Sequence, residues 1–371
     1  MIENRRIWLR QLRRFLVGHV DGPLLGYGGM LLLLGLFVLY SASGGDLFRV
    51  RGQAANILVA LAAMWAMANL PQQHLKRIAL PAYAIGLALL LAVALFGEVS
   101  NGARRWLHIG VTRIQPSELM KIAVPLMLAW YLDRHEAALR LKNFAVAALL
   151  LLVPVGLIVR QPDLGTALLV SAAGFYTLFL AGIGWRILAG LAGAMAAAAP
   201  LLWSALHDYQ RQRILTLLDP TQDPLGAGYH IIQSTIAVGS GGWFGKGWLR
   251  GTQTHLDFLP ERSTDFIFAV FAEEFGLLGS LLLLALFLLV IGRGLAIALR
   301  APTLFTRLLA GSLTLTFFTY AFVNLGMVSG ILPVVGVPLP LLSYGGTSLV
   351  TICLVFGILM NVETHKRLVR T

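Results

Sequence analysis

Asp265 has the sequence context of a general base. It closes a polar, glycine-rich stretch and directly precedes an apolar segment that we expect to be helical over 264–292. Ser263 or Thr264 can cap that helix, so the carboxylate is not needed as the cap. A carboxylate held there could accept a proton from a bound hydroxyl group. The alternative is an ordinary acid in the first turn, which the helix dipole favours.

A second pair of ionisable residues, Glu118 and Lys121, lies at the start of a helix expected over 116–132. Residues three apart share one face of a helix. The two side chains form either a structural ion pair or one wall of a polar cavity in which Lys121 meets an anionic group. Ionisable groups within apolar helices are costly and often functional, so both interpretations stay open.

Three further carboxylates stand in apolar surroundings. Asp163 can cap a helix expected over 163–182 and can face a cavity at the same time. Glu273 and Glu274 follow Asp265 on one apolar helix. Because successive residues are about 100° apart around a helix, at least one of the two must face protein. We expect them to act as packing or hydrogen-bond anchors rather than as catalysts.

Two stretches between the expected helices carry groups suited to phosphate and sugar. In 98–115, Arg104 and Arg105 could bind a phosphate through paired hydrogen bonds, and Trp106 offers a face for sugar stacking. The alternative places these three side chains in the lipid headgroup belt. The longer stretch 207–263 contains further basic groups, namely Arg213, Lys246 and Arg262.

The glycine-rich part of that longer stretch does not match a nucleotide-binding motif. Around Lys246 the P-loop pattern fails, because Ser240 stands where glycine is needed and Gly247 where Ser or Thr is needed. The G-x-G-x-x-G pattern fails at Phe244 and at Arg250. Metal-ligand spacings such as H-E-x-x-H are absent and the 8 His are scattered, so the sequence shows no metal ligand set.

The composition requires a membrane. Of 371 residues, 57% are hydrophobic and 12% are charged, against about 25% charged in a typical soluble domain. These values exclude a soluble globular enzyme and a disordered chain. A single Cys excludes a disulfide scaffold. The net charge of +12 is better explained by anionic lipid and membrane topology than by nucleic acid, which we do not expect as a partner.

Apolar runs of about 20 residues, the length that crosses a bilayer, predict ten transmembrane helices. They are expected near 24–43, 53–70, 79–97, 116–132, 143–160, 163–182, 186–206, 264–292, 304–328 and 345–362. The Lys and Arg residues of the short loops and of the amino-terminal arm favour a cytoplasmic location for both termini. The predicted fold class is an all-α integral membrane protein with N-in/C-in topology.

We expect one polytopic domain over 1–371, with a basic cytoplasmic arm at 1–23 and a long extracytoplasmic loop at 207–263 between the seventh and eighth helices. The other substantial outer segments are 98–115 and 329–344. Polar chemistry is concentrated on this outer side, which indicates that function faces outward. The proline-rich segment 329–344 is expected to form a rigid re-entrant turn that lines a cavity.

Several motifs together resemble the SEDS family (shape, elongation, division and sporulation), and within it the elongation-specific branch. They are 102–107 (GARRWL), 115–121 (QPSELMK), 161–166 (QPDLGT), 219–234 (DPTQDPLGAGYHIIQS), 239–242 (GSGG), 245–247 (GKG), 258–268 (FLPERSTDFIF) and 336–346 (GVPLPLLSYGG). The resemblance runs over essentially the whole chain. Ser263 departs from it, because relatives often have His at that position.

The resemblance implies a ten-helix peptidoglycan glycosyltransferase that polymerises lipid II, an undecaprenyl-linked precursor, at the outer face of the bacterial cytoplasmic (inner) membrane. It also implies a class B penicillin-binding protein as the crosslinking partner, an association with the elongation machinery, and a need for a divalent cation, Mg²⁺ or Mn²⁺. The family's essential aspartate falls on Asp265, and its functional carboxylate and lysine fall on Glu118 and Lys121. The candidate substrate-binding residues are Arg104, Arg105, Trp106, Gln115, Ser117, Glu118, Lys121, Asp163, Arg213, Gln233, Ser234, Lys246, Glu261, Arg262, Ser343 and Tyr344.

Three functional hypotheses follow. In the enzyme, Asp265 is the base, and Mg²⁺, Arg104, Arg105 or Lys121 meets the departing pyrophosphate. A lipid II flippase would also suit ten spans with charges at depth. Such a flippase needs a polar path to the cytoplasmic face, and the inner halves of the helices show few polar groups. A non-catalytic scaffold for a penicillin-binding protein is the third hypothesis.

Overall fold

The structure is a computed structural model that describes residues 18–100, 103–109, 112–205, 208–222, 226–256, 258–259 and 261–368. Its long helices are α2 (Gly22–Ala42), α3 (Leu47–Ala68), α4 (Gln72–Phe96), α5 (Pro116–Arg134), α6 (Leu141–Val159), α7 (Leu164–Leu180), α8 (Trp185–Ala205), α12 (Ile267–Leu299), α13 (Leu304–Val328) and α14 (Gly346–Leu368). The shorter helices are η1 (Glu136–Ala138), α9 (Asp208–Leu218), η2 (Pro220–Gln222), α10 (Ala227–Ser240) and α11 (Thr252–His255). Three strands complete the set: β1 (Glu98–Ser100), β2 (Ala103–Ile109) and β3 (Thr112–Ile114).

Each apolar segment predicted from the sequence is occupied by one long helix. Among the described residues, 7 helices are long and apolar enough to cross a membrane, namely α2, α3, α4, α6, α12, α13 and α14. Helix α7 is apolar but shorter, with 17 residues. The protein is therefore a multi-pass membrane protein whose body is helical.

Side-chain caps fix where several helices begin. Asp21, Asp46 and Asp163 each accept a hydrogen bond from a backbone N–H in the first turn of α2, α3 and α7, respectively. Thr303 and Thr306 form a reciprocal capping box at the start of α13. These bonds satisfy backbone donors that have no partner within the helix. The capping role expected for Asp163 is thus confirmed.

The segment 98–114 departs from the all-helical expectation. Its described part forms a small antiparallel sheet in the order β1-β2-β3, with Glu98 opposite Trp106 and Leu107 opposite Ile114. The sequence carries a signal for it, because an Asn-Gly pair such as that at 101–102 is typical of a hairpin turn.

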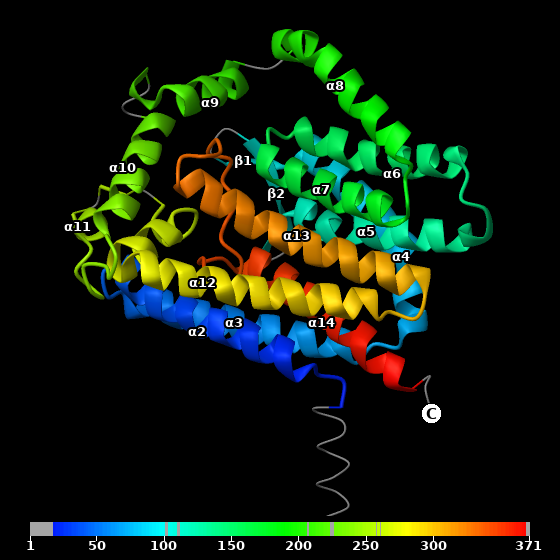
Figure 1. Cartoon of the computed structure of the whole chain (residues 1–371), viewed down its shortest axis with the longest axis horizontal. Helices are drawn as coiled ribbons and strands as arrows, with labels where there is room; N and C mark the ends of the chain where they lie inside the picture. Colours follow the sequence, from blue (N-terminus) through cyan, green and yellow to red (C-terminus); the bar gives the residue numbers. More distant parts are fainter. Residues whose placement is uncertain are drawn as a thin grey trace, which may run out of the picture.

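The stretch 207–263, expected as one long loop, is largely helical where it is described. It contains α9, η2, α10 and α11, and in Figure 1 α8, α9 and α10 follow one another as an arch beside the main bundle. Helix α10 buries Ile231, Ser234 and Ala237, which recur at the three-residue spacing of one helix face. This spacing gives α10 a buried face, which the glycine content of the stretch obscured.

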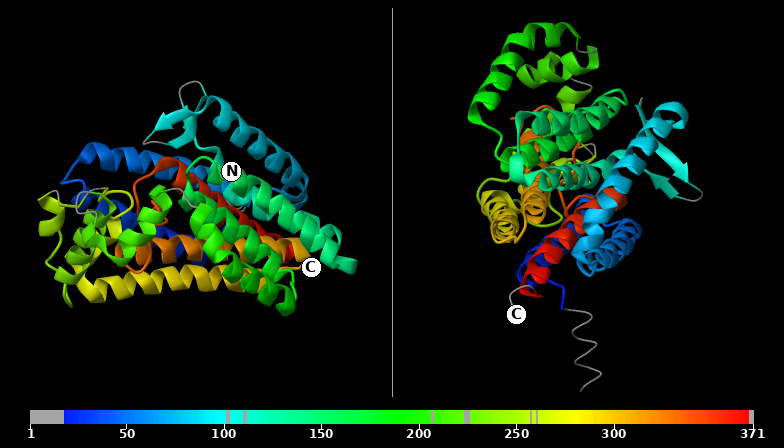
Figure 2. Two further views of the ribbon diagram at one scale, coloured as in Figure 1. Left: turned by 90° about the horizontal axis from the view of Figure 1, so that it is seen from above. Right: turned by 90° about the vertical axis from the view of Figure 1, so that its right-hand side faces the viewer.

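Helices α13 and α14 form the centre of the bundle. In their apolar windows 78% and 72% of residues are buried, against 39% or less in the other five apolar spans. Helix α14 packs along α3, while α12, α7 and α5 pack against α13 (Figures 1 and 2). The outer helices expose Leu and Phe side chains, as expected where the solvent is hydrocarbon.

The two described chain ends lie at the same end of the bundle (Figure 1). The rings of His19 and His365 stack with centroids 5.1 Å apart. Arg293 of α12 donates to Asp21 Oδ2 at 2.5 Å and to Glu363 Oε1 at 3.5 Å. These contacts join the starts and ends of three helices at this end.

Candidate active site

Asp265 lies where two chain segments meet, the segment before α12 and the segment between α13 and α14. A Cβ atom built on Gly336 would lie 3.4 Å from Asp265 Oδ2, so the carboxylate faces the backbone of the second segment. Gly336 has φ +72°, in the left-handed region that favours glycine. The carboxylate therefore sits beside a backbone turn that presents no side chain to it.

Hydrogen bonds join these two segments over several residues. Ser343 Oγ donates to the carbonyl of Thr264 at 2.6 Å and accepts from the Leu339 N–H at 2.8 Å. The Tyr344 N–H donates to the carbonyl of Ser263 at 2.9 Å. Ser343 and Tyr344, both candidates from the sequence, are thus brought next to Asp265 and support the backbone that directly precedes it.

Helix α3 adds two residues that the sequence analysis missed. Gln53, which is buried, donates through Nε2 to the Ser343 carbonyl at 3.1 Å and accepts from the Gly345 N–H at 3.3 Å. Arg49 Nη1 donates to Ser263 Oγ at 3.4 Å. The available signal was a group of polar residues, Arg49, Arg51, Gln53 and Asn56, in the first half of a helix that is otherwise apolar.

Burial raises the pKa of Asp265 from its usual value near 4 to about 6, and the nearby charge of Glu261 adds a smaller increase. A carboxyl group with this pKa is largely ionised at neutral pH and is a stronger base than an exposed aspartate. Both properties suit a group that takes a proton from a sugar hydroxyl.

The Glu118–Lys121 pair lies buried on α5. Lys121 Nζ donates to Glu118 Oε1 at 2.5 Å and stands 4.8 Å above the centre of the Tyr320 ring of α13. Glu118 Oε2 is buried and has no hydrogen-bond partner among the described residues. The pair is therefore an ion pair that retains one free acceptor, which fits either interpretation offered by the sequence.

A third group gathers at the start of α7. Gln115 Nε2 donates to Asp163 Oδ2 at 3.0 Å. Arg105 Nη2 donates to the Pro162 carbonyl at 2.5 Å, and its Nη1 lies 4.0 Å from Asp163 Oδ1. The structure thus brings Arg105, Gln115 and Asp163 together from three separate segments.

The three groups adjoin the carboxyl-terminal end of α13 and the segment that follows it. A Cβ atom built on Gly165 would lie 2.7 Å from the Val335 carbonyl oxygen, so the start of α7 touches the segment that carries Gly336. Tyr320, which Lys121 faces, lies one turn before Asn324, which bonds to the Asp265 backbone. These contacts link Asp265, Arg105 and Lys121 to one end of α13 and to the segment that follows it.

The glycine-rich stretch that matches no nucleotide motif packs against α12. Helix α12 has non-helical backbone at Gly276, with φ +64°, and the Leu277 N–H donates to the Gly242 carbonyl at 2.9 Å. A Cβ atom on Gly245 would lie 2.0 Å from the Glu274 carbonyl oxygen. Glycine is required at Gly245 because the two backbones are in direct contact.

Glu273 and Glu274 hold that stretch in place, as the sequence analysis expected. Glu273 is fully buried and its Oε1 accepts from Lys246 Nζ at 2.7 Å and from the Gln253 N–H at 3.0 Å. Glu274 Oε1 accepts from Ser41 and from the Leu249 N–H. The ammonium group of Lys246 is therefore engaged with a buried carboxylate.

The other candidates are distributed around this centre. Glu261 Oε2 accepts from Thr264 Oγ1 at 2.8 Å, and Arg262 Nη1 donates to the Thr254 carbonyl. Ser234 is buried and bonds to the carbonyl of its own helix at Ile231. The remaining candidates are Ser117, buried in α5; Trp106, half-buried in β2; Gln233, half-buried in α10; Arg213 in α9; and Arg104 in β2, whose side chain lies outside the described residues.

Comparison with known proteins identifies the class to which this fold and site belong. The family model of the FtsW/RodA/SpoVE cell cycle proteins matches residues 24–368, and the chain belongs to this family. It is 52% identical over 351 residues to the peptidoglycan glycosyltransferase MrdB of Escherichia coli K12, covering 94% of this chain and 95% of that protein. It is 37% identical to MrdB of Helicobacter pylori, covering 85% and 83% of the two chains.

Solved structures agree. A chain of a peptidoglycan synthase complex, studied for the structural coordination of polymerization and crosslinking, superposes with a TM-score of 0.82 at 36% identity and covers 94% of this chain. The rod-shape-determining protein RodA of Thermus thermophilus superposes with a TM-score of 0.71 at 33% identity, covering 93% of this chain and 96% of its own. The protein is accordingly an enzyme of the peptidoglycan glycosyltransferase class.

Proposed function

We propose that this protein polymerises lipid II into glycan strands at the outer face of the bacterial cytoplasmic membrane during cell elongation. The observation that carries the proposal is the Asp265 carboxylate, which faces the backbone of a second segment and whose pKa is raised by burial to about 6. The family and the names of its members support the reaction class.

The proposed reaction is an inverting glycosyl transfer. The 4-hydroxyl oxygen of the acceptor sugar forms a β-1,4 bond to the anomeric carbon of the donor. The bond from that carbon to the pyrophosphate oxygen breaks, and its electron pair leaves with undecaprenyl pyrophosphate. The hydroxyl proton passes to the Asp265 carboxylate. A positioned base of this kind contributes typically 10²–10⁴-fold in rate.

Arg105 and Lys121 are the basic groups that we propose to face the departing pyrophosphate. Both are held before substrate arrives, Arg105 by the Pro162 carbonyl and Lys121 by Glu118. Cations already in position stabilise developing charge without a cost of reorganisation. The other candidate binding residues remain proposed substrate contacts of the same kind.

A divalent cation, Mg²⁺ or Mn²⁺, stays a proposal that rests on the family resemblance. Among the described residues no group of three or more His, Cys, Asp or Glu side chains could hold a metal ion. These residues do not form a protein-only metal site, and we assign no step to the cation. Polymerisation measured with chelator and with added Mg²⁺ tests the requirement.

We further propose that all ten long helices span the membrane and that both termini are cytoplasmic. The placement of the two described chain ends at one end of the bundle supports this topology. Labelling of single cysteines placed at 46 and at 302 in intact cells tests it. A membrane-impermeant thiol reagent should reach the first position and not the second.

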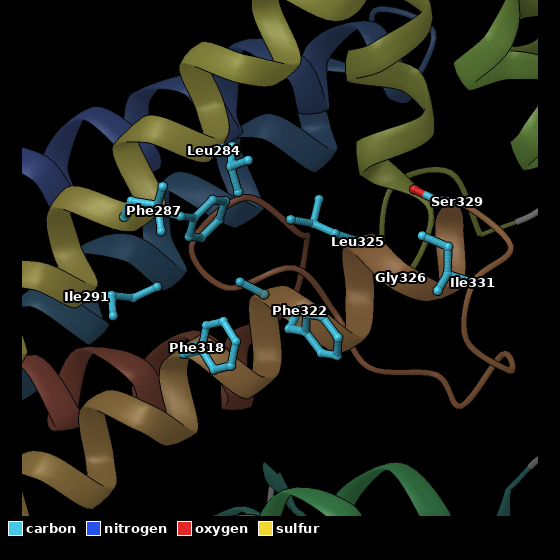
Figure 3. A pocket seen from close by; sticks show the side chains of 11 residues that line it. Leu284, Phe287, Ile291, Phe318, Phe322, Leu325, Gly326, Ser329 and Ile331 are labelled. Atoms are coloured by element: carbon cyan, nitrogen blue, oxygen red, sulfur yellow. The ribbon is translucent and has the colours of Figure 1, made fainter.

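A class B penicillin-binding protein is the proposed partner, bound through a transmembrane segment at the groove between α12 and α13. Figure 3 shows Phe287 of α12 and Phe322 of α13 at this apolar groove, which encloses about 210 Å³ and reaches Leu325. Leu325→Trp should fill the groove and reduce co-purification of the partner. Leu152→Trp, on the exposed face of α6, is the matched control and should leave co-purification unchanged.

One assay separates the enzyme from the flippase and the scaffold. Purified protein in vesicles receives lipid II on one side only. Glycan product indicates a polymerase, and transfer of lipid II across the bilayer without product indicates a flippase. If neither occurs while the partner still binds, the chain acts as a scaffold.

A further inference from the structure

Asn324 connects the two segments that meet at Asp265. Its side chain is fully buried near the carboxyl-terminal end of α13. Nδ2 donates to the Asp265 carbonyl at 2.8 Å and to the Val337 carbonyl at 2.7 Å. Because both partners are carbonyl acceptors, the amide NH₂ group of Asn324 must face them; it is the only part of the side chain that can donate hydrogen bonds.

The two carbonyls belong to the residues that define the position of the carboxylate. One is the carbonyl of Asp265 itself. The other follows Gly336, whose backbone lies against Asp265 Oδ2. A single amide therefore sets the separation between the backbone of the base and the turn that the base faces.

We propose that Asn324 is a positioning residue for the general base, holding the Asp265 backbone against the 336–337 turn so that the carboxylate is aimed at the acceptor hydroxyl. The proposal rests on the proposed function of Asp265. Asn324 acts through the backbone and touches no reacting atom, so its effect is on the placement of the base.

Burying the Asn324 amide also has an energetic cost. Asn324 Oδ1 is buried and has no hydrogen-bond partner among the described residues. A buried acceptor without a partner destabilises the folded protein. An apolar residue would avoid that cost but would leave both carbonyls without a donor and would release the two segments from each other.

A second buried asparagine in the same protein provides a matched control. Asn361 of α14 is also fully buried and donates through Nδ2 to the carbonyls of Met67, Ala68 and Leu70. Its Oδ1 likewise has no partner among the described residues. It fastens α14 to the end of α3, and none of its bonds reaches the segments around Asp265.

The charged and titratable groups around Asp265 must stay constant in the test. Glu261 lies on the same segment and raises the pKa of Asp265. His230 of α10 stacks on Phe266 with ring centroids 5.5 Å apart, and Arg49 of α3 reaches Ser263. Arg262 is directed to Thr254. Substitution of Asn324 by an uncharged residue alters none of these charges.

The experiment measures polymerisation of lipid II by purified full-length Asn324→Leu and Asn361→Leu between pH 4.5 and 8. A displacement near 1 Å of a catalytic group can cost on the order of 10²-fold. We expect Asn324→Leu to lower kcat by that order, with KM for lipid II little changed. The acid limb of its pH–rate profile should have a midpoint at lower pH than that of the wild type. The reason is that an Asp265 carboxyl group released from its buried position is better hydrated, which favours its charged form. Asn361→Leu should keep the wild-type limb.

A second variant guards against a misfolded protein. Asn324→Thr restores one donor, and we expect its kcat to lie between those of wild type and Asn324→Leu. If Asn324→Leu keeps the wild-type kcat and acid limb, or if both asparagine variants lose activity equally with unmoved limbs, the positioning role is wrong. Failure of Asp265 as the base is a separate result, since it requires an active Asp265→Asn.

Discussion

Replacing Asp265 by Asn removes the proposed base and almost nothing else. The two side chains have nearly the same shape. The bond from Asn324 to the Asp265 carbonyl and the bond from Tyr344 to the Ser263 carbonyl both involve main-chain acceptors that the substitution keeps. We expect polymerisation to fall by roughly 10²–10⁴-fold, the usual contribution of a positioned base. Binding of the partner should be unchanged.

The same substitution should stabilise the protein. Raising the pKa of Asp265 from 3.8 to about 6 means that the folded state disfavours the charged carboxylate. The difference is about 2 pH units, or about 3 kcal/mol at 1.36 kcal/mol per unit, which is an upper value because the side chain is not fully enclosed. The neutral amide has no such cost, so the unfolding midpoint of Asp265→Asn at pH 7 should exceed that of the wild type.

The pH dependence follows with a definite sign. The folded state binds the Asp265 proton more tightly than the unfolded state does. Protonation of Asp265 therefore favours the folded state; this contribution to stability is complete below about pH 4 and is lost as the pH rises through about 6. Activity runs the other way, because the base must be ionised. Wild-type kcat/KM should be half its high-pH plateau near pH 6 and about one tenth of that plateau at pH 5.

The assay compares wild type, Asp265→Asn and the control Asp46→Asn, with glycan product and thermal unfolding measured on the same samples. Asp46 caps α3 in a half-buried position, and Asn caps a helix equally well. An inactive but more stable Asp265→Asn agrees with the reasoning. Near-normal glycan synthesis by this variant would refute the assignment of the base. A lowered unfolding midpoint would refute the account of its burial.

Two further predictions concern the surroundings of the base. Lys121→Met should destabilise the protein by about 3–5 kcal/mol, because Glu118 is left charged and buried, and the added change Glu118→Gln should recover much of that loss; equal thermal midpoints for the single and double variants would contradict the ion pair. Gly336→Ala, at φ +72°, and the control Gly44→Ala, at φ +69° with nothing within 4 Å, should each cost about 1–2 kcal/mol of backbone strain. Only the first should lower polymerisation; the same activity in both variants would show that the turn does not place the carboxylate.

Hydropathy along the chain was sufficient to predict the long helices. Each apolar run became a helix, because a run of apolar residues with internal backbone bonds is the stable form in lipid. The strands at 98–114 were missed, since short polar segments carry weak signals and their pairing depends on neighbours. The helices within 207–263 were missed because glycine and proline obscured their spacing.

For the candidate site too, the sequence indicated some features and not others. Residue type and position singled out Asp265, Glu118 and Lys121, because an ionisable group next to or within an apolar helix is unusual whatever its partners are. Whether each group has a partner was not visible. Lys246 and Glu273 meet across 27 residues, which depends on how the glycine-rich stretch folds against α12.

By itself, then, the sequence determined the membrane class, the helical segments and the candidate side chains for the chemistry, since each follows from local composition. Only the tertiary structure decided what surrounds the base. The Asn324 amide reaches 59 residues back to Asp265 and 13 residues ahead to Val337. Such distances are bridged by the packing of helices, and no local pattern in the chain encodes which two carbonyls will lie within reach of one amide.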